Sequence, residues 1–103
     1  MPDDPVALMR AIKRLIESLP KKPDELGFAA EIEQQIAVYY LRLGDETSAG
    51  DWWVRAAQEA EKYSQMTEAQ VMLELAAEKL PNHLGVRQEL KRIVERIRAA
   101  ERR

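Results

Sequence analysis

Five segments of this chain carry apolar residues at helical spacing, and each is bounded by residues that start or stop helices. The first segment opens at Asp4-Pro5, where a side-chain acceptor precedes a proline suited to the first helical turn, and Pro20 ends it. Its apolar face consists of residues spaced by a helical turn, namely Leu8, Ile12, Leu15, Ile16 and Leu19. Because no segment alternates with a period of two, the sequence predicts an all-α protein.

Capping signals place the other four helices. Their expected start residues, in chain order, are Pro23, Ser48, Thr67 and Asn82. Ser48 pairs with Asp51, and Thr67 pairs with Gln70, at the spacing of a capping box. Gly44 closes the second helix, since glycine readily adopts the left-handed conformation that follows a helix end.

The connections between these predicted helices are only a few residues long, so successive helices are expected to be antiparallel neighbours. A chain of 103 residues with 46% hydrophobic composition can bury one core. The prediction is therefore a single domain over residues 1–103. It contains about five antiparallel helices, arranged as a short solenoid-like helical-repeat array or as a bundle.

The segment 50–82 resembles one tetratricopeptide repeat, a helix–turn–helix unit of 34 residues. The matching residues are Trp53, Ala57, Ala69, Leu73, Ala76 and Pro81. The alanines suit a close helix crossing, Trp53 fills the space above them, and Pro81 stops the second helix. The chain departs from the family pattern at Ser64, which stands where the turn glycine is usual, and at Ala56 and Ala60, which replace larger residues.

This resemblance implies a binding scaffold, because such repeats usually present a concave groove to peptides. One version of the family grips a C-terminal carboxylate with basic and amide residues on the first helix of the repeat. The corresponding positions here are Val54 and Gln58. The basic residue is missing, so that clamp is not predicted.

All six aromatic residues fall in the second and third predicted helices: Phe28, Tyr39, Tyr40, Trp52, Trp53 and Tyr63. Adjacent tryptophans point about 100° apart on a helix, so one is expected in the core and the other nearer a groove or interface. Three interpretations stay open: an ordinary core, a partner-binding or oligomer surface, and a small-molecule pocket. The candidate partner- or ligand-binding residues are Tyr39, Tyr40, Trp52, Trp53 and Gln58.

The residues that carry most enzyme chemistry are scarce. The chain has no cysteine, which excludes disulfides, thiolate metal sites and cysteine nucleophiles. His83 is the only histidine; it follows Asn82 at a helix start and is interpreted as a surface residue of the first turn. Ser48, Ser64 and Thr67 suit caps better than nucleophiles. We therefore predict no catalytic residues, no metal site, no cofactor and no enzymatic activity.

Gly27, Gly50 and Gly85 lie within or beside the first turns of predicted helices, where glycine costs roughly 1 kcal/mol relative to alanine. They are therefore candidates for close approach of the backbone to a neighbour or a ligand. No glycine-rich phosphate-binding motif surrounds them.

Charge and hydropathy limit the classes of partner that the sequence predicts. The net charge of −2 gives no overall attraction to nucleic acid. Basic residues gather in the last predicted helix, but glutamates interleave with them, so this helix is interpreted as a solvated face. No run of eighteen apolar residues predicts a membrane span, and the N-terminus lacks the pattern of a signal peptide. The sequence predicts a soluble cytoplasmic protein without nucleic-acid or membrane partners.

The leading hypothesis is a non-enzymatic helical-repeat scaffold for protein interaction or self-association. The alternative is a helical protein that binds a small molecule or cofactor in a pocket lined by Tyr39, Tyr40 and one tryptophan. Agreement among caps, charges and breakers also favours a designed sequence, whereas the paired tryptophans and Gln34-Gln35 argue against one. A designed origin predicts a melting midpoint above the mesophilic range of roughly 45–65 °C.

Overall fold

The structure, a computed structural model, describes residues 4–21 and 28–102, and it forms five α-helices within them. In chain order they are α1 (Pro5–Glu17), α2 (Phe28–Leu43), α3 (Glu46–Lys62), α4 (Met66–Lys79) and α5 (Leu84–Glu101). Within the same two ranges no residue is in a β-strand. The predicted all-α class is therefore confirmed.

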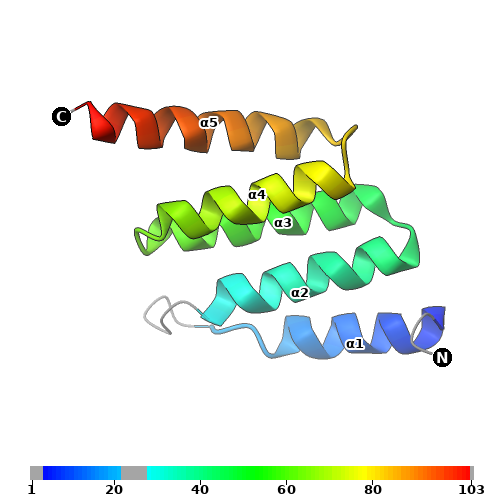
Figure 1. Cartoon of the computed structure of the whole chain (residues 1–103). Coiled ribbons are helices and arrows are strands. Elements are labelled where there is room, and N and C mark those ends of the chain that lie inside the picture. The colour runs from blue at the N-terminus through cyan, green and yellow to red at the C-terminus, as the bar shows by residue number, and fades with distance from the viewer. Residues whose placement is uncertain (1–3, 22–27, 103) are drawn as a thin grey trace.

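The helices run up and down in chain order and form a flat array (Figure 1). Its principal dimensions are 50 × 33 × 16 Å. α3 packs on α2, α4 and α5, whereas α1 packs on α2. The edges of the array are α1 on one side and α5 on the other (Figure 1). α3 is thus the central helix, and α1 depends mainly on one neighbour.

Small side chains on α3 make this central position possible. Its buried residues are Ala49, Gly50, Trp53, Ala56, Ala57 and Ala60. Alanine and glycine allow neighbouring helix axes to approach closely, and one large ring then fills the remaining space. That ring is Trp53, which is fully buried in a cluster with Ala37 of α2, Ala76 of α4 and Val86 of α5.

Three of the predicted helix starts are wrong. α3 is capped by Asp45 rather than Ser48: the Asp45 Oδ1 atom accepts a hydrogen bond from the Ser48 backbone N–H at 3.1 Å. Gly44 does end α2 in the left-handed conformation, with φ at +84°, so Asp45 can cap the next helix at once. The predicted start of the second helix at Pro23 lies outside the described residues.

α4 also begins earlier than predicted. Its N-cap is Gln65, whose side chain makes no capping hydrogen bond, and Met66 is the first helical residue. The expected capping box of Thr67 and Gln70 does not form. Instead, the Gln70 side chain donates to Glu74 one turn further along, at 3.4 Å.

The N-cap of α5 is His83 rather than Asn82. The His83 Nδ1 atom accepts from the Val86 backbone N–H at 3.1 Å, and its Nε2 atom lies 3.2 Å from the Thr47 carbonyl oxygen of α3. The side chain is only 13% exposed, so the interpretation of His83 as a surface residue is wrong. The ring joins the starts of two helices.

Position 50 has room only for glycine because the His83 ring lies against it. A Cβ atom added at Gly50 would stand 2.1 Å from His83 Cδ2, and one at Gly85 would stand 3.1 Å from His83 Cε1. Close approach to a neighbour is therefore confirmed at these two glycines. Gly27 lies outside the described residues.

Candidate functional site

The two tryptophans of α3 have different environments, as their adjacent positions require. Trp53 is fully buried, which confirms that one of the pair belongs to the core. Trp52 is half-buried, and the Arg55 guanidinium lies over its ring, 4.3 Å from the centroid. Trp52 is therefore the member of the pair that a partner can reach, while Trp53 supports the fold.

The other candidate residues are spread over different surfaces. Tyr39 and Tyr40 are both half-buried on α2, but they line separate grooves. Gln58 is exposed on α3 and lines neither groove. Neither groove is lined by a tryptophan. The structure thus does not bring Tyr39, Tyr40 and a tryptophan together around one of these two grooves.

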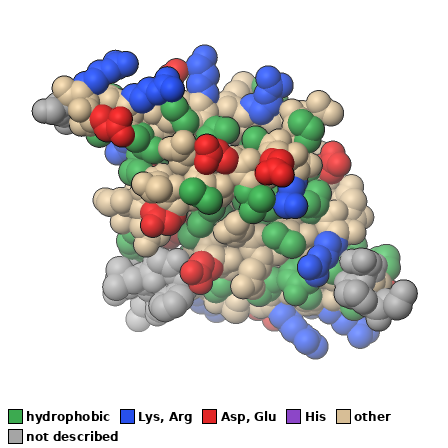
Figure 2. Space-filling view, in the orientation of Figure 1, with side chains coloured by type: hydrophobic (Ala, Val, Ile, Leu, Met, Phe, Trp, Pro, Cys, Tyr) green, Lys and Arg blue, Asp and Glu red, His purple; other side chains and the backbone are tan. Residues whose placement is uncertain are grey.

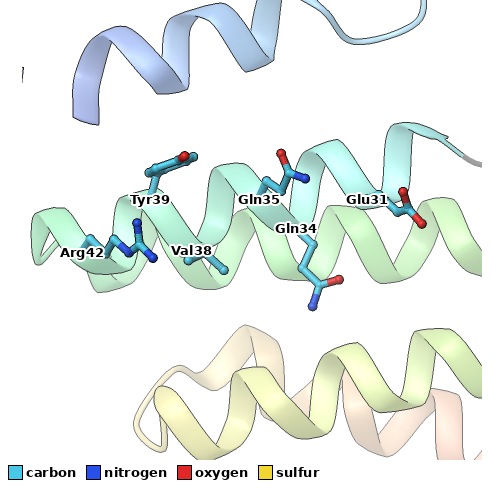
Figure 3. Close-up of a pocket in the computed structure, with 6 residues that line it drawn as sticks. All are labelled: Glu31, Gln34, Gln35, Val38, Tyr39 and Arg42. Carbon is cyan, nitrogen blue, oxygen red and sulfur yellow. The ribbon is translucent and has the colours of Figure 1, made fainter. Parts of the chain in front are cut away.

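The first groove follows one helix, α2, and most of the residues that line it have polar side chains (Figure 3). It has a volume of about 420 Å³ and is lined by Glu31, Gln34, Gln35, Val38, Tyr39 and Arg42. The Arg42 guanidinium lies 5.5 Å from the centre of the Tyr39 ring. Figure 3 shows Gln35 and Tyr39 on the side of α2 that faces α1, whereas Gln34 points to the other side. These polar groups diverge rather than converge on one point, which does not suit a compact small molecule.

The second groove is larger and mostly apolar; we call it the α1 groove. It has a volume of about 700 Å³. Its lining residues are Pro5, Val6, Met9, Arg10, Ile12, Lys13, Ile16, Glu17 and Tyr40. Three of its large apolar side chains are exposed, Val6 by 57%, Met9 by 52% and Ile16 by 39%. They are three of the five exposed large hydrophobic residues in the described part of the chain.

The α1 groove exists because α1 is apolar on two faces. Leu8 and Ile12 are buried, as their spacing predicts, and they form the face that packs on the array. The periodicity also predicts Ile16 on this buried face, but Ile16 is exposed and belongs to the second face with Val6 and Met9. The signal was present in the sequence: positions 6, 9 and 16 form their own helical stripe, offset from the buried one.

Glu33 of α2 is the one buried charged residue of the described part of the chain. Its Oε2 atom lies 3.5 Å from the Arg55 Nε atom of α3, and its Oε1 atom has no hydrogen-bond partner among the described residues. Burial raises the pKa of the Glu33 carboxyl above its ordinary value, and the Arg55 charge opposes this shift. A raised pKa is typical of catalytic acids, but Glu33 lines neither groove, so it has no route to a substrate there.

A second carboxylate links α3 to α5. Glu61 accepts hydrogen bonds from Arg92 and Arg96, and Arg92 also bonds Glu89. Hydrogen bonding from Arg92 is the main cause that lowers the pKa of the Glu61 carboxyl below its ordinary value, although partial burial opposes it. This network explains part of the basic composition of α5 as contacts between helices.

Two kinds of site are absent from residues 4–21 and 28–102. No group of three or more histidine or acidic side chains is arranged to hold a metal ion there. Nor is any helix in those ranges long and apolar enough to cross a membrane. Searches against family models, curated proteins and solved structures find no match to this chain.

Proposed function

We propose that this chain is a non-enzymatic helical-repeat scaffold that binds another protein, and that the α1 groove is its interaction surface. The single observation that carries the proposal is the exposed apolar stripe of α1. Soluble proteins rarely leave a contiguous apolar patch uncovered unless it serves an interface.

Three further features support an interaction role over catalysis. Tyr40 extends the apolar lining of the groove from α1 onto α2, so the surface is a groove rather than a single ridge. The tetratricopeptide-like residues of segment 50–82, including Trp53 and Leu73, are buried and form part of the core of the array. Neither groove gathers the nucleophile, base and donor that a reaction needs.

Selection of binding peptides tests the proposal even though the natural partner is not identified. A display library of helical peptides with unbiased charge is selected on the immobilised chain, and the Kd of each enriched peptide is measured. The double substitution Met9→Gln/Ile16→Gln is expected to weaken binding by at least about 10-fold, which corresponds to about 1.4 kcal/mol. Both residues are exposed, so the circular dichroism spectrum is expected to remain unchanged.

Leu84 provides the matched control. It is 63% exposed at the start of α5, outside the α1 groove, so Leu84→Gln removes an apolar side chain that is more exposed than Met9 or Ile16. This variant is expected to bind the enriched peptides as the original chain does. Equal affinity for all three chains, or no enriched peptide at all, would show that the α1 groove is not an interaction surface.

A further inference from the structure

We infer that the α1 groove accepts an amphipathic helix from another protein, with apolar residues spaced by three and four and carboxylates beside their midpoint. This inference rests on the proposed function and adds the chemistry of the partner. It follows from the spacing, the shape and the charge of the groove.

The spacing defines the shape of the partner. Val6, Met9, Lys13 and Ile16 follow one another at intervals of three, four and three residues, as the facing positions of paired helices do. The ten steps from Val6 to Ile16 extend about 15 Å along the helix. A partner helix of about three turns covers this length, with one apolar side chain for each gap in the stripe.

The charge defines the sign of the partner. Lys13 holds the position of this stripe nearest its midpoint that is not apolar, Arg10 lies beside it, and both line the groove. Among the described residues that line the groove, the one acidic residue is Glu17, at its end. Cationic side chains that flank an apolar seam pair with carboxylates of a facing helix and disfavour cations there. The centre of the partner stripe is therefore acidic.

A second copy of this chain fits the groove poorly. Two α1 helices paired antiparallel bring the Arg10 and Lys13 side chains of both copies together at the centre. The outer face of α5 is also rich in arginine, and Figure 2 shows Lys and Arg along the α5 edge of the array and again along the opposite edge. α4 is acidic outside, but Val71 is its one exposed large hydrophobic residue, too few to fill the three gaps of the stripe.

A membrane surface also fits less well than a helix. A basic amphipathic helix can lie on anionic lipid, but it must then present its apolar side chains as a convex ridge. Here Tyr40 of α2 lines the same depression as Met9 and Ile16 of α1, so the apolar surface is concave.

A pair of designed peptides tests the inference directly. The probe is a fluorescein-labelled 14-residue helix with leucines at the complementary spacing and four glutamates beside them; the matched peptide has glutamine in place of each glutamate. Binding is measured by fluorescence anisotropy at low salt. The glutamate peptide is expected to bind at least about 10-fold tighter than the glutamine peptide, and added salt is expected to remove the difference.

Variants of the chain assign the effect to the groove. Arg10→Glu/Lys13→Glu is expected to weaken the glutamate peptide by at least about 10-fold. The matched control is Arg87→Glu/Lys91→Glu, which makes the same charge change at exposed positions of α5 outside the groove. The control is expected to retain Kd within about twofold, since its charges lie away from the peptide.

Three results would overturn the inference. If both peptides bind with equal affinity and Met9→Gln/Ile16→Gln abolishes their binding, the groove is an interaction surface but its partner is not acidic. Concentration-dependent dimers in sedimentation equilibrium, abolished by Met9→Gln, would assign the groove to a second copy. Stronger Met9-dependent binding to phosphatidylserine-containing vesicles than to the glutamate peptide would assign it to anionic lipid.

Discussion

His83 and Gly50 occupy one small space between the starts of α3 and α5, so the effect of changing either residue depends on the other. Gly50→Ala forces the His83 ring out of its place, because the new Cβ atom would stand 2.1 Å from the ring. We expect this substitution to cost about 2–3 kcal/mol of unfolding free energy. His83→Ala alone is expected to cost about 1–2 kcal/mol through the lost cap.

The double variant gives the decisive result. Once His83 is alanine, Gly50→Ala no longer displaces a ring and replaces a helix-interior glycine, so it is expected to stabilise by about 1 kcal/mol. Gly50→Ala is therefore expected to lower the unfolding free energy when His83 is present and to raise it when His83 is replaced by alanine. Urea denaturation of the original chain, the two single variants and the double variant measures this reversal. If the two substitutions are additive, the ring does not occupy the space that Gly50 leaves.

Ser64 holds an uncommon backbone conformation at the end of α3. Its φ is +63°, in the left-handed region that favours glycine, and Ser64 is the position where the tetratricopeptide pattern usually has one. Ser64→Gly is therefore expected to raise the unfolding free energy by about 0.5–1 kcal/mol, as measured by thermal denaturation. Gly44→Ala is the converse control, because it adds a side chain to a residue with a φ of +84° where the new Cβ meets no atom within 4 Å. Its expected loss of about 1 kcal/mol of unfolding free energy therefore measures the cost of the left-handed backbone alone. An unchanged melting midpoint for Ser64→Gly would show that the left-handed backbone of Ser64 does not destabilise the fold.

The contact of α2 with α3 contains a carboxylate that destabilises the fold when charged. Burial raises the pKa of Glu33, so the folded state holds the proton of the Glu33 carboxyl more tightly than the unfolded chain does. The contribution of Glu33 to the unfolding free energy is therefore most favourable at acid pH. It is lost as the pH rises from the ordinary pKa of a glutamate through the raised pKa of Glu33 in the folded state. Glu33→Gln is expected to increase stability at pH 7 and to show little gain near pH 3, measured by denaturant unfolding across this range.

The contact of α3 with α5 has the opposite pH dependence. Arg92 lowers the pKa of Glu61, so this carboxylate stabilises the fold above its ordinary pKa, and the stabilisation is lost as the pH falls through the lowered value. Glu61→Gln is expected to destabilise at pH 7 by about 1 kcal/mol, since both arginines are substantially exposed to solvent. At pH 2 the loss is expected to vanish. Parallel pH profiles for the Glu33 and Glu61 variants would contradict both assignments.

The helices themselves could be predicted from the sequence, but several of their starts could not. Periodicity and the breakers Gly44 and Pro81 locate five helices, since these are local properties of the chain. The start of α3 was misplaced because Asp45 and Ser48 are both good caps, and only the backbone shows that Ser48 donates to Asp45. The start of α5 was missed because histidine is an uncommon cap, and its bond to Thr47 depends on tertiary packing.

The α1 groove was missed for a related reason. An apolar stripe predicts that a helix buries one face, but it does not say how many neighbours the helix has. Leu8 and Ile12 satisfy the contact with α2, and the local sequence gives no sign that Val6 and Met9 stay exposed within the described part of the chain. The aromatic residues lie on α2 and α3 instead, where Trp53 fills the core.

The array is expected to be least stable at the edge where the proposed interaction surface lies. In a linear stack each helix is held by its neighbours, so an edge helix with one interface opens more easily than a central one. α1 packs mainly on α2 and buries Leu8 and Ile12, whereas α3 packs on three helices. Native-state hydrogen exchange is expected to show α1 amides at least about 10-fold less protected than those around Trp53.

Leu8→Ala sharpens this prediction because it leaves a cavity between α1 and α2. It is expected to lower the protection of α1 amides further while those of α5 stay unchanged, since the two helices lie at opposite edges (Figure 1). The glutamate peptide, if it binds the α1 groove, must stabilise α1 by mass action and raise its protection before that of any other helix. Uniform exchange in all five helices, with and without the peptide, would mean that the array opens only as a unit and that α1 is not a separate binding element.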